Sequence, residues 1–304
     1  MQTTLANKIT FNGVGLHGGK TALMELYPTV AGNGITFERL DLSHQNVTKA
    51  LYDNVTDTKL CTKLGRGAEA VGTIEHIMAA LAGCGVHNVH IRLFGPEVPI
   101  MDGSSVEFIK RITETGIVTL DADLQAVRIK QSIRVEEGAA FAELRPADVM
   151  SISFSIDFDV PVIGQQSKSL CMANGAFIRE LCDSRTFCKK AEVDWLQQNG
   201  LGLGGSLDNA IVVDENTVLN PGGFRYADEC VRHKMLDALG DLYLAGAPII
   251  GHYVGHRAGH RMTNNVLRKL FAHPDHFEWV TVTPAMAALL PGSDLKESDL
   301  ALIA

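Results

Sequence analysis

The sequence predicts an α+β fold of two similar lobes, with helices packed between two sheets and an insertion in each lobe. Three observations lead to this prediction. The chain has 304 residues, 46% of them hydrophobic, so it is longer than one core usually supports and apolar enough to build two. Each half runs from antiparallel strands to helices, as α+β units do. The second half also repeats the order of the first, which indicates an internal duplication.

The first half opens with strand patterns and then changes to helical ones. Gly18 and Gly19 form a turn before an alternating strand, and Pro28 ends that strand. A helix that begins near Thr73 follows, and after it come an apolar strand and a second helix. The expected elements are strands at 21–26, 34–41 and 88–94, and helices at 73–83 and 104–112.

The second half repeats this order, and His76 and His233 occupy corresponding positions in the two halves. A pseudo-two-fold pairing of the halves would bring these two helices face to face. The expected elements are strands at 128–135, 140–144, 151–158 and 248–254, and helices at about 226–244 and 263–271. The expected domains are 1–124, with an insertion at about 42–63, and 125–304, with an insertion at about 188–213.

Composition excludes several classes of partner. The formal net charge of −8 would repel phosphates, so we expect no nucleic-acid partner and no basic anchor at a membrane surface. No apolar run approaches the ~18 residues of a spanning helix, and the start lacks a signal-peptide pattern, so we expect no transmembrane segment and a cytoplasmic protein. The six cysteines show no Cys-x-x-Cys spacing and are expected to be reduced. We expect a monomer, because nothing in the sequence demands a partner chain.

Two of the expected helices carry metal-ligand side chains. His233 and Asp237 stand four residues apart, which places an imidazole and a carboxylate on one helical face. A lone pattern of this kind is more commonly a solvated polar face. Together with His76, however, it supplies the three protein ligands that a catalytic Zn²⁺ takes beside water. Glu75 is then the expected general base for that water, and an exposed first-turn carboxylate is the alternative.

The glycine-containing segment 255–265 supplies a further histidine just before the last helix. As an imidazolium, His260 could stabilise an oxyanion or donate a proton to a leaving amine, and Asp241 could hold it charged. A surface histidine in a flexible loop is the alternative. Thr186 and Phe187 add a hydroxyl and an aromatic ring ahead of the second insertion, although a helix end would also account for them.

These residues lie within longer stretches that resemble a known family over essentially the whole chain. The stretches are Gly13-Val-Gly-Leu-His17, Thr73-Ile-Glu-His76, Val98-Pro-Ile-Met-Asp-Gly-Ser104, Arg185-Thr-Phe187, Leu203-Gly-Gly-Ser206, Ala210-Ile-Val-Val-Asp214, Arg232-His-Lys-Met-Leu-Asp-Ala-Leu-Gly-Asp241 and Gly259-His260. The sequence closely resembles the UDP-3-O-acyl-N-acetylglucosamine deacetylases, the zinc amidases of bacterial lipid A synthesis. The resemblance implies two α+β lobes around the active site and hydrolysis of the acetamide on a UDP-linked, 3-O-acylated glucosamine, the committed step of that synthesis.

The resemblance also implies a role for each matching residue. His76, His233 and Asp237 would bind the zinc, Glu75 would be the base, and Asp241 would orient His260 as the acid or electrostatic partner. Thr186 would help bind the oxyanion, Lys234 would contact the substrate, and Phe187 would lie beside the sugar. The other implied contacts are Phe158 near uracil, Arg257 near the UDP phosphates, Cys61 where the first insertion returns to the pocket, and Leu201, Leu203, Ala210 and Val212 along the acyl chain. Zn²⁺ is the implied cofactor, and Fe²⁺ could replace it in the cell because loading also depends on availability.

Two rival classes follow from the residues alone. A zinc peptidase would need a pattern such as His-Glu-x-x-His, whereas Glu75 precedes a single histidine on its helix. A non-catalytic nucleotide-sugar-binding or scaffold protein, in which the polar stripes are merely structural, would hold no stoichiometric metal and release no acetate. Metal analysis together with an acetate assay separates these classes.

Overall fold

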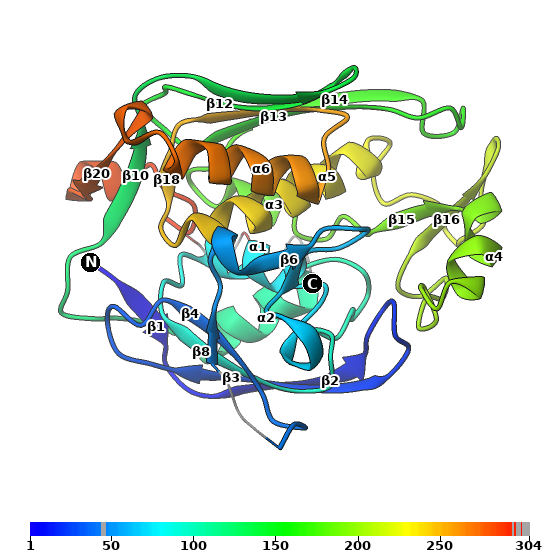
Figure 1. The fold of residues 1–304 in the computed structure, drawn as a ribbon, viewed down its shortest axis with the longest axis horizontal. Helices are drawn as coiled ribbons and strands as arrows, with labels where there is room; N and C mark the ends of the chain where they lie inside the picture. Colours follow the sequence, from blue (N-terminus) through cyan, green and yellow to red (C-terminus); the bar gives the residue numbers. More distant parts are fainter. Residues whose placement is uncertain (44–46, 294, 296–298, 300–304) are drawn as a thin grey trace.

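Two five-stranded sheets lie on opposite sides of a layer of helices in the computed structural model, which describes residues 1–43, 47–293, 295 and 299 (Figure 1). The strand order is β2-β3-β8-β4-β5 in the first sheet and β11-β12-β19-β13-β14 in the second. The predicted α+β class, with helices between two sheets, is therefore confirmed.

The two sheets have the same topology. In each, the central strand pairs in parallel with one neighbour and antiparallel with the other, β8 with β4 and β3, and β19 with β13 and β12. This match is the structural form of the repeated element order. The first sheet consists of β2 (Ile9–Val14), β3 (Thr21–Pro28), β4 (Ile35–Arg39), β5 (Val47–Lys49) and β8 (Val89–Phe94). The second consists of β11 (Ile133–Glu137), β12 (Ala140–Arg145), β13 (Ser151–Asp157), β14 (Gln165–Cys171) and β19 (His252–His256).

Helices α1 (Glu75–Cys84) and α5 (Glu229–Leu242) pack against each other at the centre of the helical layer (Figure 1). Every residue of α1 is buried, as expected for a helix that is enclosed on all sides. Gly240 permits the close packing, because a Cβ there would lie 2.0 Å from the carbonyl oxygen of Glu75. The two histidine-bearing helices thus lie face to face, as the repeat predicts.

Two amphipathic helices flank this central pair. Helix α2 (Val106–Thr115) packs on α1, and α6 (His260–Phe271) packs on α5. Each turns an apolar stripe inward. Most of the buried apolar side chains of both halves merge into one cluster, which includes Phe108 of α2 and Tyr253 of β19. The helical layer is therefore a core that both halves share.

Two predicted strands differ from the structure, because each is divided in two. The segment 128–135 forms β10 (Gln125–Ile129) and β11, and the segment 248–254 forms β18 (Ile249–Ile250) and β19. Strands β10, β18 and β20 (Phe277–Thr281) form a separate three-stranded sheet. The chain bends at Gly251, where an added Cβ would lie 2.6 Å from Cγ1 of Ile129. This close packing coincides with the end of the pairing between β10 and β18. The alternation of apolar and polar residues depends only on neighbours in the sequence, so it cannot predict a contact between segments that are far apart in the chain.

The predicted insertions contain small sheets of their own. Strands β6 and β7 pair within the first insertion, while β5 joins the first large sheet, and β15, β16 and β17 form a three-stranded sheet beside α4 at the second. We propose that the domains follow the predicted boundary at 124/125, which falls between β9 and β10. The remaining elements are β1 (Thr3–Leu5), β6 (Val55–Asp57), β7 (Lys63–Leu64), β9 (Ile117–Thr119), α3 (Ala176–Glu180), β15 (Phe187–Lys189), α4 (Lys190–Gln198), β16 (Ile211–Asp214), β17 (Thr217–Val218), α7 (Pro284–Ala287) and the 3₁₀ turns Tyr52–Asn54, Gly67–Glu69, Tyr243–Ala245 and Pro274–His276. Within the described part of the chain, no helix has both the length and the apolar character needed to cross a bilayer.

Replacing Gly240 with alanine should separate α1 from α5. The added methyl group would collide with the backbone of Glu75 and not with a movable side chain, so we expect the free energy of unfolding to fall by about 1–3 kcal/mol or more. Denaturant unfolding measures the change. Gly18→Ala is the matched control, since its Cβ would meet only one atom, at 3.5 Å. Equal stability of the two variants would contradict the close-packing argument.

Candidate active site

Three buried side chains converge where α1 meets α5. The first turn of α1 carries His76, and α5 carries His233 and Asp237 on successive turns. Oδ1 of Asp237 lies 3.6 Å from Nε2 of His76 and 3.3 Å from Nε2 of His233, and the potential ligand atoms all lie within 4.8 Å of one another. A tetrahedral zinc site with its usual bond lengths separates ligand atoms by roughly 3.3–3.5 Å. The spacing therefore suits a single metal ion.

The hydrogen bonds of this cluster also fit a metal. Oδ1 of Asp237 is buried without a hydrogen-bond partner among the described residues, which is costly for a carboxylate unless a cation accompanies it. Nδ1 of His233 donates to the carbonyl oxygen of Ser184 at 3.0 Å, which leaves Nε2 free as a ligand. Burial lowers the pKa of His233 to about 3, so its imidazole is neutral at pH 7, the form that binds metals.

Glu75 lies beside the three donors with one carboxylate oxygen occupied, and its other oxygen accepts no hydrogen bond within the described part of the chain. Its Oε2 accepts the backbone N–H of Thr62 at 2.9 Å, and its Oε1 lies 3.9 Å from Nε2 of His260. Burial raises the pKa of the carboxyl, although His260 and His76 oppose that rise. A buried carboxylate with a raised pKa and one free oxygen is suited to accept a proton.

His260 is the first residue of α6 and faces the same space. Its Nδ1 donates to Oδ2 of Asp241 at 2.8 Å, and its Nε2 lies 4.0 Å from Oδ2 of Asp237. Burial opposes a charge on this imidazole, but Asp241 and Glu75 outweigh burial and raise the pKa of His260 to about 9. The two carboxyl groups therefore favour the charged, imidazolium form of the ring.

A cavity of about 510 Å³ opens over this cluster and contains most of the predicted site residues. Lys234 lies at its base and contacts Oδ2 of Asp237 with its ammonium group. Burial disfavours that charge, but Asp237 raises the pKa of Lys234. The predicted residues that line the cavity are Glu75, His76, Phe158, Thr186, Phe187, His233, Lys234, Asp237, Arg257 and His260, while Asp241 lies behind His260.

Aromatic and cationic side chains form the outer wall of the cavity. The rings of Phe158 and Phe187 meet edge to face at 5.3 Å. Arg257 is half exposed, and its guanidinium lies 3.7 Å from the carboxylate of Asp157. Its backbone is left-handed, with a φ of 50°, and its N–H bonds to the carbonyl of Ser155 at 2.8 Å. These contacts leave a cation at the mouth.

A second cavity of about 440 Å³ adjoins the first at the second insertion. Ala210 and Val212 are among its lining residues, together with Leu196, Leu207 and Leu219. Leu201 and Leu203 are not among its lining residues, and Leu203 is half exposed. Cys61 is buried and lines neither cavity, and burial raises the pKa of its thiol to about 12. The walls common to both cavities are Leu16, His17, Leu60, Thr186, Phe187 and Cys188.

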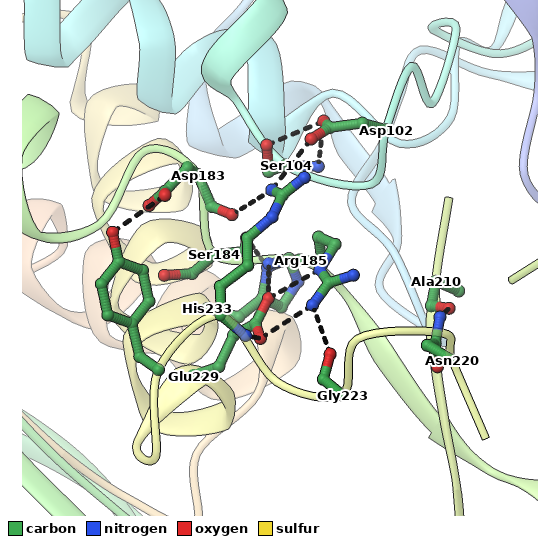
Figure 2. Close-up of polar contacts among 12 residues, drawn as sticks. Asp102, Ser104, Asp183, Ser184, Arg185, Ala210, Asn220, Gly223, Glu229 and His233 are labelled. Atoms are coloured by element: carbon green, nitrogen blue, oxygen red, sulfur yellow. Dashed lines mark hydrogen bonds and ion pairs between the residues drawn. The ribbon is translucent and has the colours of Figure 1, made fainter. Parts of the chain in front are cut away.

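A buried ion pair between Arg185 and Glu229 holds the segment just before Thr186. Figure 2 shows this pair near Ser184 and His233. The guanidinium of Arg185 donates to both carboxylate oxygens of Glu229, at 2.9 and 3.1 Å, and also to the carbonyl of Gly223 at 3.0 Å. Glu229 is 1% exposed and lies one turn before His233 on α5. This pair therefore holds the neighbouring Ser184 carbonyl, the hydrogen-bond acceptor for His233.

Sequence reasoning missed two contributors to this site. Glu229 precedes His233 by four residues, a spacing that could have indicated a shared face, but its partner Arg185 lies 44 positions away. Thr62 has no local pattern of its own, since its partners Glu75 and Asp241 come from distant segments.

The fold and this site define a class of protein. A buried His–His–Asp set that adjoins a proton acceptor and a charged histidine, and that opens on a deep cavity, is the arrangement of a metal-dependent hydrolase. A family model for UDP-3-O-acyl N-acetylglycosamine deacetylase matches residues 2–272, and the chain belongs to this family.

Curated relatives agree along the length of the chain. A UDP-3-O-acyl-N-acetylglucosamine deacetylase from Myxococcus xanthus (strain DK1622) is 44% identical over 300 residues, which cover 99% of this chain and 95% of the relative. Proteins of the same name from Geobacter sp. (strain M21) and Acidithiobacillus ferrooxidans (strain ATCC 53993 / BNL-5-31) are 43% and 45% identical, over 93% and 92% of both chains.

Replacing His233 with alanine should abolish stoichiometric metal binding, because only two of the three donors remain. Metal content after dialysis against trace zinc measures this. His252→Ala, which removes a histidine bonded to Ser153 on β19, is the control and should keep its metal. Full occupancy in His233→Ala would remove this histidine from the ligand set.

Replacing Glu229 with glutamine should destabilise the protein and loosen the metal. The change leaves the guanidinium of Arg185 buried without its counter-charge, so we expect the free energy of unfolding to fall by about 3 kcal/mol or more. Metal affinity should fall about tenfold, because the Ser184 carbonyl is no longer held against His233. Glu278→Gln is the control, as it breaks an exposed pair with Arg128. Unchanged stability and affinity would contradict the positioning role.

Proposed function

We propose that this chain is a Zn²⁺-dependent amidase that hydrolyses the N-acetyl group of a UDP-linked, 3-O-acylated N-acetylglucosamine. The products are acetate and the free amine, in the committed step of lipid A synthesis. Family membership supports this substrate. The observation that carries the proposed chemistry is the buried oxygen of Asp237 between the Nε2 atoms of His76 and His233, which has no hydrogen-bond partner among the residues that the structure describes.

His76, His233 and Asp237 would hold the metal. When bound, Zn²⁺ supplies a Lewis acid that polarises an amide carbonyl and lowers the pKa of a coordinated water to ~7. Neutral imidazoles and one carboxylate also suit Fe²⁺, and we propose Zn²⁺ as the metal that supports the reaction.

Glu75 would act as the general base. Its Oε1 accepts a proton from the attacking water, since the Thr62 N–H already occupies Oε2. The water oxygen then bonds to the acetamide carbon, the C–N bond breaks, and the amine nitrogen takes up a proton. Burial raises the pKa of Glu75, so its carboxylate binds a proton more strongly.

His260 and Thr186 would face the charge that develops on the acetamide oxygen. The imidazolium of His260 serves either as a fixed positive charge or as the donor of the proton that the amine takes up. Asp241 keeps Nδ1 of that ring occupied, so Nε2 is the nitrogen directed at the substrate. Lys234 adds a further positive charge at the base of the cavity.

The two cavities would divide the substrate between them. The first presents Phe158 and Phe187 to the nucleoside and sugar, and Arg257 to the diphosphate. The second is apolar and would take the acyl chain along Ala210 and Val212. Since every one of these residues comes from a single chain, we propose that the enzyme acts as a monomer, and its UDP-linked substrate leads us to propose a cytoplasmic location.

Replacing Glu75 with alanine should lower kcat about 10²–10⁴-fold while the metal stays bound, because the base is lost and the three donors are kept. Acetate release from the acetylated UDP substrate and metal content measure the two effects. Glu114→Ala, at an exposed position of α2, is the control.

Two outcomes would count against the proposed function. Acetate release that persists unchanged after the metal is removed with a chelator would exclude the metal role. Wild-type protein that carries stoichiometric metal but releases no acetate would exclude this substrate.

A further inference from the structure

One buried threonine links the proposed base to the Asp–His pair. Thr62 is 1% exposed, its backbone N–H donates to Oε2 of Glu75 at 2.9 Å, and its hydroxyl donates to Oδ1 of Asp241 at 2.5 Å. Oδ2 of Asp241 in turn accepts from Nδ1 of His260 at 2.8 Å. Thr62 and Asp241 therefore connect the proposed base to the imidazole of His260 through three hydrogen bonds.

We propose that Thr62 is a positioning residue of the deacetylation reaction, which sets the geometry of Glu75 and His260 relative to each other. The inference rests on the proposed function, because that function gives these two side chains their roles. Thr62 itself lines neither cavity and would touch no substrate. Its effect passes through its two hydrogen-bond partners.

Thr62 can set this geometry because its carbonyl group and the chain that follows it are held by backbone hydrogen bonds. Its carbonyl accepts the N–H of Ile74, directly before α1 begins, at 3.4 Å. Two residues on, Leu64 is buried and exchanges both backbone hydrogen bonds with Val71, each at 2.8 Å. A donor held in this way is already oriented before substrate arrives, which is the condition for a positioning role.

The same contacts determine which oxygens stay free. Because the Thr62 N–H occupies Oε2 of Glu75, Oε1 remains directed at the cavity and at His260. Both oxygens of Asp241 are occupied, one by Thr62 and the other by His260, so neither is left to rotate toward another partner. The hydroxyl of Thr62 thus fixes the carboxylate that in turn fixes the imidazole.

The hydroxyl bond also joins the two halves of the chain. Thr62 lies at the end of the first insertion, whereas Asp241 lies on α5, 179 positions later. The base comes from the first half and the imidazolium from the second, so their relative placement depends on contacts between halves. This bond is such a contact, made within the catalytic cluster itself.

Thr62→Val tests the inference, because valine keeps the shape and the backbone N–H but lacks the hydroxyl. We expect kcat to fall about 10–100-fold, as for other residues that orient a site from behind, with KM within about twofold and stoichiometric metal. Thr62→Ser, which keeps a hydroxyl at this position, should have a kcat within about threefold of wild type. Thr113→Val, at a threonine whose hydroxyl bonds within α2, is the matched control.

A double-variant comparison separates positioning from a general packing effect. If Thr62 acts through Asp241, adding Thr62→Val to Asp241→Asn should lower kcat less than threefold further. Unchanged kcat in Thr62→Val, full multiplication of the two losses, or a serine variant as poor as valine would each overturn the inference. Where the valine variant does not fold, Thr62→Ala carries the same comparison with a smaller side chain.

A second readout needs no substrate and so stands apart from the proposed function. The Nδ1–H of His260 gives a proton resonance that His260→Gln identifies by its loss. It should shift or broaden in Thr62→Val and keep its position in Thr62→Ser. An unchanged resonance in the valine variant overturns the inference even if kcat falls. A wild-type protein that keeps the resonance but releases no acetate contradicts the proposed function alone.

Discussion

Lys234 contacts Oδ2 of Asp237, but Oδ1 lies buried between two imidazole rings with no hydrogen-bond partner among the described residues, which is unfavourable unless a further cation reaches it. Three carboxyl groups and two cationic side chains surround the site. These are Glu75, Asp237 and Asp241 on one side and Lys234 and His260 on the other. A divalent ion between the three donors would give this oxygen of Asp237 its partner. The rest of the fold holds this cluster together and shields it from water.

The duplicated topology makes the cluster possible, but its two halves contribute unequally. Helices α1 and α5 occupy matching positions behind sheets of the same strand order, and Gly240 lets their backbones approach. The α1 side supplies one potential donor and the proposed base, whereas α5 supplies two potential donors and the aspartate that is hydrogen-bonded to His260. Symmetry thus explains why distant segments meet. The asymmetry lies in side chains, which can diverge without disturbing the packing of the pair.

The sequence predicts features that depend on residues close together in the chain, or on the repeat, better than features that depend on contacts between distant segments. His233 and Asp237 share a helical face by their spacing alone, and the repeat related His76 to them. Thr62 could not be found in this way, because its importance arises only when α1 and α5 come together. The second cavity shows the same limit. Leu207 lines it and Leu203 does not, since the path of a glycine-containing loop decides which way each leucine lies.

The mouth of the cavity explains how a protein of net charge −8 can admit an anionic ligand. Its cations, Lys189, Arg257 and Arg261, are each paired with a carboxylate at the surface. Pairs of this kind contribute about 0–1 kcal/mol because water screens them, so a diphosphate that engages two or three cations at once can displace the carboxylates. The adjoining cavity is apolar. A ligand with charge at one end and a hydrocarbon chain at the other therefore matches the chemistry of both cavities, whereas a nucleotide or a fatty acid alone would match only one.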